Sequence, residues 1–322
     1  MFDIITIGSA MKDVFLTSKS IEISRTKMAA AGKGVLLALG SKVEVDDIIL
    51  ETGGGGTNTA VSFANLCLRT AFFGKTGKDS AGKHILDVLK ENKVSTGLVL
   101  ADKQRTTGYS TIISVRSGER VALVYRGANN FITKIPRFKA RWVYLAPLSG
   151  MSLSIIPKII KNKNFKIAMN PSSTYINRGI PKNILKNIDI LLLNREEAAR
   201  LTRVNFKDEK RIFKKLIHLT KGTVVMTEGE KGAMACDGKH IYKCNSPNVK
   251  VVNTLGAGDA FNSGFCYEII KGNDIEKALK TGTLNAVSVI QELGAKKGLL
   301  KKGQLSKHKA LMSRIKVRKG RI

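Results

Sequence analysis

The sequence predicts an α/β fold with a mostly parallel central sheet, helices on both of its faces and a small separate β-sheet. Apolar strand patterns alternate with helical patterns from Asp3 to Thr227. This βαβ rhythm requires a parallel sheet that is covered on both sides. Two segments, residues 14–52 and 100–130, interrupt the rhythm with additional β-rich runs. A chain of 322 residues is long enough for one large domain and one smaller domain.

The two interrupting segments predict the smaller sheet. Residues 108–115 and 120–125 are β-rich and are joined by Ser117-Gly118, which is a hairpin signal. Residues 42–50 alternate in part between polar and apolar side chains. We therefore expect a small β domain from residues 14–52 and 100–130. The large α/β domain would comprise residues 1–13, 53–99 and 131–322.

Polar residues follow several of the predicted apolar strands. Asp13, Asn170, Asn194 and Thr227 each come shortly after an apolar run. In parallel sheets, ligands bind beyond the carboxyl ends of the strands, which share one edge. These four side chains are therefore expected to converge on a single site.

The most informative motif is the turn Gly256-Ala257-Gly258-Asp259. Residues 249–252 before it predict the end of an extended segment, and Phe261, Phe265 and Ile269 after it predict one apolar helix face. Free amides at a helix start, together with the helix dipole, favour an anion such as phosphate. A carboxylate there would repel phosphate unless it accepts a proton from an attacking hydroxyl. The motif predicts phosphoryl transfer to an alcohol; the alternative is a glycine loop that only caps a helix.

A second glycine cluster, residues 53–56, precedes a helical pattern through Val61, Ala64 and Leu68. Consecutive glycines let the backbone approach a ligand closely, and the nearby Asn58 offers both a donor and an acceptor. We expect this segment to contact a ligand. The alternative is a flexible hinge, and both descriptions can hold together.

These motifs resemble the two signatures of the PfkB carbohydrate kinase family, the ribokinase-like sugar and nucleoside kinases. Residues 254–261 resemble the second signature, and the tetraglycine segment resembles the first. The resemblance implies a ribokinase-like fold in which the small sheet is a lid over the substrate. It also implies roles for seven residues: Asp259 as catalytic base, the anion hole of Gly256, Ala257 and Gly258, and substrate binding by Asp13, Gly54 and Asn58.

The same resemblance implies where ATP and magnesium bind. The segment Asn194-Arg195-Glu196-Glu197 resembles an Asn-x-x-Glu element that holds Mg²⁺ and phosphate, with Glu197 acting through water. Its alternative is a helix-capping arrangement of the same two side chains. Nucleotide contacts are implied for Asn194, Thr227, Gly229, Gly232 and Asn285.

One position departs from the family pattern. Most relatives carry Asp-Thr before the glycine turn, whereas this chain carries Asn253-Thr254. In relatives that are activated by K⁺, that aspartate helps to bind the cation. An amide oxygen at Asn253 can coordinate a monovalent cation but supplies no charge, so activation by K⁺ stays open.

The composition is strongly basic, with a formal net charge of +30. Such a charge attracts polyanions without specificity, but the aromatic content is only 6% and no recognition-helix pattern is present. We therefore do not expect a nucleic-acid partner. The four cysteines lack metal-ligand spacing, and no apolar run is long enough to cross a membrane. We expect a cytoplasmic location.

The sequence thus predicts an ATP-dependent kinase that phosphorylates a hydroxyl of a small sugar, with ADP as an open alternative donor. The nearest alternative is a nucleoside kinase of the adenosine type, because Asp13 suits the vicinal diol that ribose and nucleosides share. Alternatives of another class are a non-catalytic sugar-binding or nucleic-acid-binding protein. A homodimer through the lid is a further expectation from the family.

Overall fold

The computed structural model describes residues 1–21, 23–26, 33–115, 120–161, 164–305 and 307–321. Its central element is a nine-stranded sheet with the order β17-β16-β15-β14-β13-β12-β11-β1-β6. In chain order its strands are β1 (Phe2–Ile7), β6 (Thr70–Phe73), β11 (Ala140–Leu145), β12 (Lys166–Met169), β13 (Ile190–Asn194), β14 (Thr223–Thr227), β15 (Ala233–Cys236), β16 (His240–Cys244) and β17 (Val317–Arg321). Strands from β6 to β14 run parallel to their neighbours, and β15 to β17 add an antiparallel edge.

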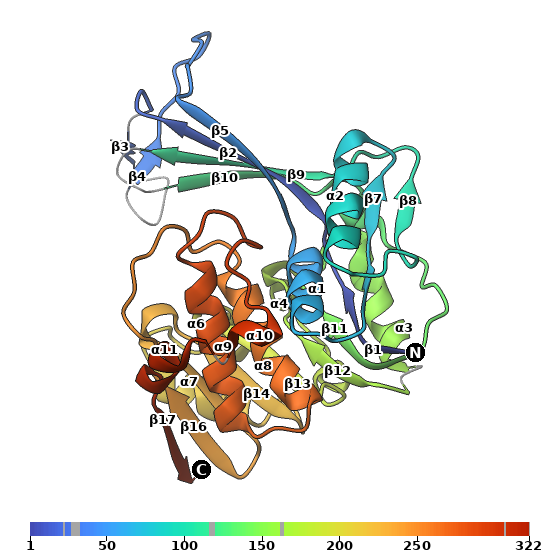
Figure 1. Cartoon of the computed structure of the whole chain (residues 1–322), viewed down its shortest axis with the longest axis vertical. Helices are drawn as coiled ribbons and strands as arrows, with labels where there is room; N and C mark the ends of the chain where they lie inside the picture. Colours follow the sequence, from blue (N-terminus) through green and yellow to red (C-terminus); the bar gives the residue numbers. More distant parts are fainter. Residues whose placement is uncertain (22, 27–32, 116–119, 162–163, 306, 322) are drawn as a thin grey trace.

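Helices cover both faces of this sheet (Figure 1). One face packs against α3 (Ile155–Lys161), α4 (Ser173–Arg178), α5 (Lys182–Leu185), α6 (Arg195–Thr202) and α7 (Glu209–Leu216). The other packs against α1 (Gly55–Asn65), α8 (Ala257–Ile270), α9 (Ile275–Val289), α10 (Lys302–Leu305) and α11 (Lys309–Arg314). Among the described residues, every helix is too short or too polar to span a bilayer.

The strand β13 shows how both faces of the sheet are buried, because its first four side chains are all apolar. On β13, Ile190 and Leu192 enter one apolar cluster, whereas Leu191 and Leu193 enter the cluster on the opposite face. Successive side chains of a strand point to opposite faces, so a doubly covered strand must be apolar throughout. The predicted α/β fold with a mostly parallel, doubly covered sheet is confirmed.

A separate four-stranded sheet projects from the main body (Figure 1). Its order is β10-β9-β2-β5, formed by β2 (Met11–Ser18), β5 (Asp47–Gly53), β9 (Gly108–Val115) and β10 (Arg120–Tyr125). The strands β9 and β10 pair as an antiparallel hairpin, as predicted, although the predicted turn Ser117-Gly118 lies outside the described residues. The small separate sheet is therefore confirmed.

The limits of the two sheets differ slightly from the expected domain boundaries. β2 begins at Met11, so Asp13 lies on the smaller sheet and not on the large domain. Residues 100–102 form β8 (Leu100–Asp102), which pairs with β7 (Lys75–Gly77) instead of joining the four-stranded sheet. β3 (Ile23–Arg25) and β4 (Lys33–Val35) form another short pair. The remaining elements are α2 (Ser80–Glu91) and the 3₁₀ helices η1 (Gly127–Phe131), η2 (Gly150–Ser154) and η3 (Gly229–Lys231).

Candidate active site

The glycine turn opens helix α8 as the sequence indicates. Gly256 has a φ of 81°, and a Cβ there would lie 2.5 Å from the Cβ of Ala295. Only glycine meets both conditions without strain. A Cβ on Gly258 would meet nothing within 4 Å, so this residue faces open space. Asp259 is the acidic residue of the first helical turn. The helix start therefore combines main-chain amides with one carboxylate on the same turn.

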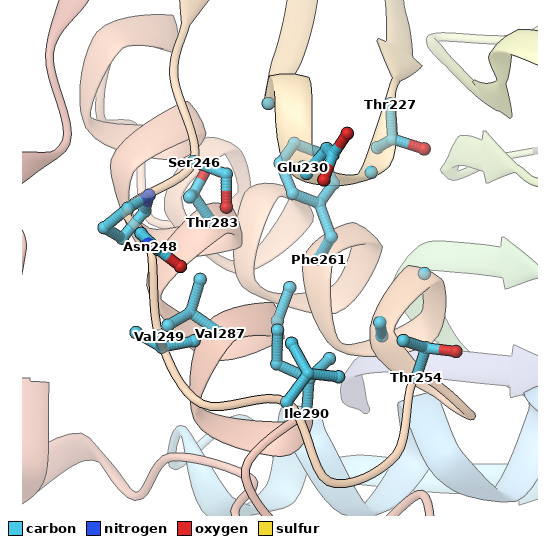
Figure 2. Close-up of a pocket in the computed structure, with 17 residues that line it drawn as sticks. Thr227, Glu230, Ser246, Asn248, Val249, Thr254, Phe261, Thr283, Val287 and Ile290 are labelled. Carbon is cyan, nitrogen blue, oxygen red and sulfur yellow. The ribbon is translucent and has the colours of Figure 1, made fainter. Parts of the chain in front are cut away.

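A cavity of about 750 Å³ lies beside this helix start. Gly258 is part of its wall, as are three residues at the end of β14 and in the following turn: Thr227, Gly229 and Gly232. Figure 2 shows the Val249, Val287 and Ile290 side chains gathered in one part of the wall, apart from Thr227. A cavity of this size, with an apolar part and a helix N-terminus, has the dimensions and donors that a nucleotide needs.

The chain that leads into the glycine turn was expected to be the end of an extended segment. In the structure, residues 249–252 belong to no strand of a sheet. Val249 and Val251 line the cavity. These valines are therefore placed against the opening and not in a sheet.

Asp259 and the tetraglycine segment meet at the other side of the helix start. The Asn58 side chain amide donates to Asp259 Oδ2 over 2.9 Å. A Cβ on Gly55 would lie 3.3 Å from Asp259 Oδ1. Asn58 and Asp259 are 201 residues apart in the sequence. The two motifs are therefore distant along the chain but contact each other at one carboxylate.

The tetraglycine segment combines a turn with a helix start. Gly54 has a φ of 95° and precedes α1, while Gly55 and Gly56 already belong to the first turn of that helix. A Cβ on Gly56 would lie 2.8 Å from the carbonyl carbon of Gly8. The close approach of α1 to the end of β1 therefore explains why this helical position is a glycine. The run of glycines in the sequence did not reveal this contact.

Asp13 reaches the same region from β2. Its side chain is buried, and a Cβ on Gly53 would lie only 1.8 Å from Asp13 Oδ2. Burial raises the pKa of the Asp13 carboxyl, and a hydrogen bond from Ser110 opposes that rise. The structure therefore brings Asp13, Asn58, Asp259 and the tetraglycine segment that contains Gly54 close to one another.

The Asp259 carboxyl has its pKa raised by burial. The hydrogen bond from Asn58 and the positive charge of Lys296 oppose this rise, whereas the negative charge of Asp13 adds to it. A raised pKa brings a carboxylate closer to the range in which it exchanges protons at neutral pH.

Lys296 is a site residue that the sequence did not reveal. It lies in the loop after α9, and its Nζ donates to the Thr52 carbonyl over 2.6 Å and to Asn58 Oδ1 over 2.8 Å. A single lysine in a chain with 55 Lys and Arg residues carries no signal until the fold places it.

Asn194 and Glu197 form a capping box at the start of α6. Asn194 Oδ1 accepts from the Glu197 N–H over 2.8 Å, and Glu197 Oε2 accepts from the Asn194 N–H over 3.0 Å. Oε2 also accepts from Asn170 Nδ2 over 3.5 Å, and burial raises the pKa of the Glu197 carboxyl. The capping alternative is therefore present in the structure.

The capping box does not consume the whole Glu197 carboxylate. Every hydrogen bond described for it falls on Oε2, which leaves Oε1 for a water molecule of a hydrated ion. No group of three or more His, Cys, Asp or Glu side chains that could hold a metal exists among the described residues. Mg²⁺ commonly keeps several waters and needs one or two carboxylates plus substrate phosphates, so this single carboxylate fits the ion.

Two other predicted site residues, Asn285 and Asn253, are buried in the protein interior. Asn285 is fully buried: its Nδ2 donates to Ser62 Oγ and the Ala260 carbonyl, and its Oδ1 accepts from the Leu300 N–H. The structure does not bring Asn285 to the cavity, although its neighbours Ala286 and Val287 line it. Asn253 Oδ1 accepts from the Leu255 N–H over 2.8 Å, just before the glycine turn.

Comparison with known proteins agrees with this geometry. The pattern of the pfkB family carbohydrate kinases matches residues 1–302. An uncharacterised sugar kinase of Archaeoglobus fulgidus is 31% identical over 250 residues, which cover 74% of this chain and 98% of that protein.

Solved structures share the fold. The ribokinase of Arabidopsis thaliana, solved with ribose and ATP, has a TM-score of 0.81 at 22% identity, with 97% of this chain and 98% of that chain covered. The nucleoside kinase of Methanocaldococcus jannaschii has a TM-score of 0.78 at 17% identity, with 95% and 97% covered.

Proposed function

Because the chain belongs to the pfkB family of carbohydrate kinases, we propose that it transfers the γ-phosphoryl group of ATP to a hydroxyl of a small sugar. Membership of this family makes it a phosphotransferase that acts on an alcohol. The observation that carries this proposal is the position of Asp259. Its carboxylate lies on the first turn of α8 and accepts a hydrogen bond from Asn58, while the preceding residue Gly258 lines the cavity.

In the proposed reaction, Asp259 accepts the proton of the acceptor hydroxyl as its oxygen forms a bond to the γ-phosphorus. The bond from that phosphorus to the β–γ bridging oxygen breaks, and ADP leaves. The amides of Gly256, Ala257 and Gly258 stabilise the negative charge on the phosphoryl oxygens. Glu197, which lies beside Asn194, would hold a hydrated magnesium ion, and that ion would neutralise charge on the nucleotide phosphates.

The acceptor is proposed to lie between the two sheets. Asn58 and Asp13 act on Asp259, Gly54 lies in the tetraglycine segment, and none of the three lines the nucleotide cavity. A carboxylate accepts hydrogen bonds from two adjacent hydroxyls well, so Asp13 favours a vicinal diol. Ribose and nucleosides both offer one, and the fold likeness to a nucleoside kinase keeps a nucleoside as the second candidate.

The test is phosphorylation of an acceptor panel by the purified protein. Ribose, fructose, sugar acids and nucleosides are incubated with Mg²⁺ and either ATP or ADP, and the phosphorylated product is identified by mass spectrometry. We expect turnover of a sugar with ATP. Turnover confined to nucleosides would select the second candidate, and no turnover of any alcohol would refute the proposal.

We further propose that the small sheet closes over the acceptor and pairs with the small sheet of a second copy. Strand register places Asp13 and Glu51 on one face of the sheet. Leu50, Val14, Thr111 and Leu123 form a row across the opposite face. Leu50 and Leu123 in that row are 55% and 59% exposed. An apolar sheet face of this kind usually marks an interface.

Association through this face is expected to be lost on introducing charge. The double substitution Leu50→Glu and Leu123→Glu should convert a dimer into a monomer, because like charges would be buried in the interface. Sedimentation velocity of both proteins at several concentrations measures this. A wild-type monomer, or a double variant that remains dimeric, would contradict the proposed pairing.

A further inference from the structure

The Lys296 ammonium group lies at the tetraglycine segment, on the acceptor side of the site. Its Nζ is held by the Thr52 carbonyl at 2.6 Å and by Asn58 Oδ1 at 2.8 Å. Thr52 and Asn58 flank the tetraglycine segment on either side. The lysine is therefore fixed at the segment proposed to bind the acceptor and is not extended into solvent like the neighbouring Lys297, whose side chain is 58% exposed.

The contact with Asn58 determines which way the Asn58 amide points. A side-chain amide has one accepting end and one donating end. Lys296 donates to Oδ1, so Nδ2 is turned toward Asp259 Oδ2 at 2.9 Å. The reverse orientation would set the amide N–H groups against the ammonium and the amide oxygen against the carboxylate. Lys296, Asn58 and Asp259 are thus connected in a chain that has one favourable orientation.

Charge supports the same connection. The carboxylates of Asp13, Asp259 and Glu51 all act on the Lys296 ammonium. Burial lowers the pKa of Lys296 to about 8, although the three carboxylates oppose this shift. Lys296 is therefore mostly protonated below that pH. Glu51 has a second partner in Lys297, whose Nζ lies 3.3 Å from Glu51 Oε1.

Four groups from different parts of the chain face Asp259. Asn58 on α1 donates to it, Lys296 after α9 attracts it, and Asp13 on β2 repels it. Tyr144 on β11 is also near, but burial raises the pKa of its hydroxyl well above the usual value, so it stays neutral. Lys296 is thus the positive charge among the described groups that opposes protonation of Asp259.

We infer that Lys296 is a positioning residue for Asp259, which it orients through the Asn58 amide and keeps in the charged form that can accept a proton. This inference rests on the proposed function, because it gives Lys296 a role only if Asp259 acts as the base. It also predicts that the contribution of Lys296 depends on pH, as a purely structural contribution would not.

The kinetic test compares three variants across pH with an acceptor that the wild-type protein phosphorylates. In Lys296→Met the acid limb of kcat should move up by about one to three pH units, because a nearby opposite charge lowers a carboxyl pKa by that amount. The activity loss is therefore large at pH 6 and small at pH 9. Lys296→Arg should restore the wild-type limb, and Lys297→Met should match wild type at every pH.

Measuring kcat at saturating acceptor separates Asp259 from Asp13, since changes in acceptor binding then appear in KM. An equal loss at all pH values in Lys296→Met, with the unfolding temperature unchanged, would overturn the inference while the proposed function stands. Absence of turnover by wild type would overturn the proposed function itself.

A measurement without turnover tests the connection directly. Trace acetylation of the full chain at a series of pH values, read by mass spectrometry, gives the titration of Lys296. In Asp259→Asn, loss of the carboxylate should shift that titration to lower pH, whereas the titration of Lys297 should not change. An identical Lys296 titration in both proteins would show that the two groups do not interact, and would refute the inference.

Discussion

Replacing Asp259 with asparagine should lower kcat by about 10²–10⁴-fold, which is the usual contribution of a positioned general base. The amide keeps the shape of the side chain but cannot accept the hydroxyl proton. Nucleotide affinity should be unchanged or slightly higher, because the substitution removes a negative charge from a helix start that binds phosphate. The loss therefore appears in kcat and not in the KM for ATP.

The variant should also remain folded. Burial raises the pKa of Asp259, so the charged carboxylate is less favourable in the folded protein than in water, and a neutral amide removes that cost. Steady-state kinetics, ATP titration by calorimetry and thermal unfolding test the three parts. Asp87→Asn, on α2 and outside the residues that line the cavity, is the matched control. Activity retained within about tenfold would show that Asp259 is not the base.

The sequence predicted the parts of the fold that local patterns determine. Uninterrupted apolar runs predicted β12, β13 and β14, and polar residues at their carboxyl ends predicted the edge where Asn194 and Thr227 lie. The hairpin of β9 and β10 followed from two β-rich runs. These predictions depend on side-chain period and turn chemistry, which neighbouring residues establish among themselves.

Other features depend on contacts between distant segments and could not be read locally. Gly56 is a glycine because α1 lies against Gly8, and the Asn285 side chain is used to join α1, α8 and the chain after α9. Lys296 becomes part of the site only because its loop lies beside Thr52 and Asn58. Such residues have ordinary sequence surroundings, so only the folded arrangement distinguishes them.

Replacing Asp13 with alanine should raise the KM for the acceptor by about 10²-fold, with a smaller change in kcat. A hydrogen bond to a charged group contributes roughly 1.5–3 kcal/mol, and one carboxylate can accept from two adjacent hydroxyls. The KM for ATP should not change, because Asp13 is not among the residues that line the nucleotide cavity. Asp47→Asn, at the far end of β5, is the matched control.

Gly53→Ala tests the same role while leaving the Asp13 charge in place. Gly53 is not among the glycines with positive φ, so alanine is compatible with its backbone. The added Cβ would nevertheless lie 1.8 Å from Asp13 Oδ2, which forces the carboxylate to move. If the Asp13 carboxylate accepts hydrogen bonds directly from the acceptor, its displacement and its removal should both raise the acceptor KM. If Gly53→Ala retains the wild-type KM and Asp13→Ala does not, the carboxylate acts through its charge alone, and direct binding of a diol is refuted.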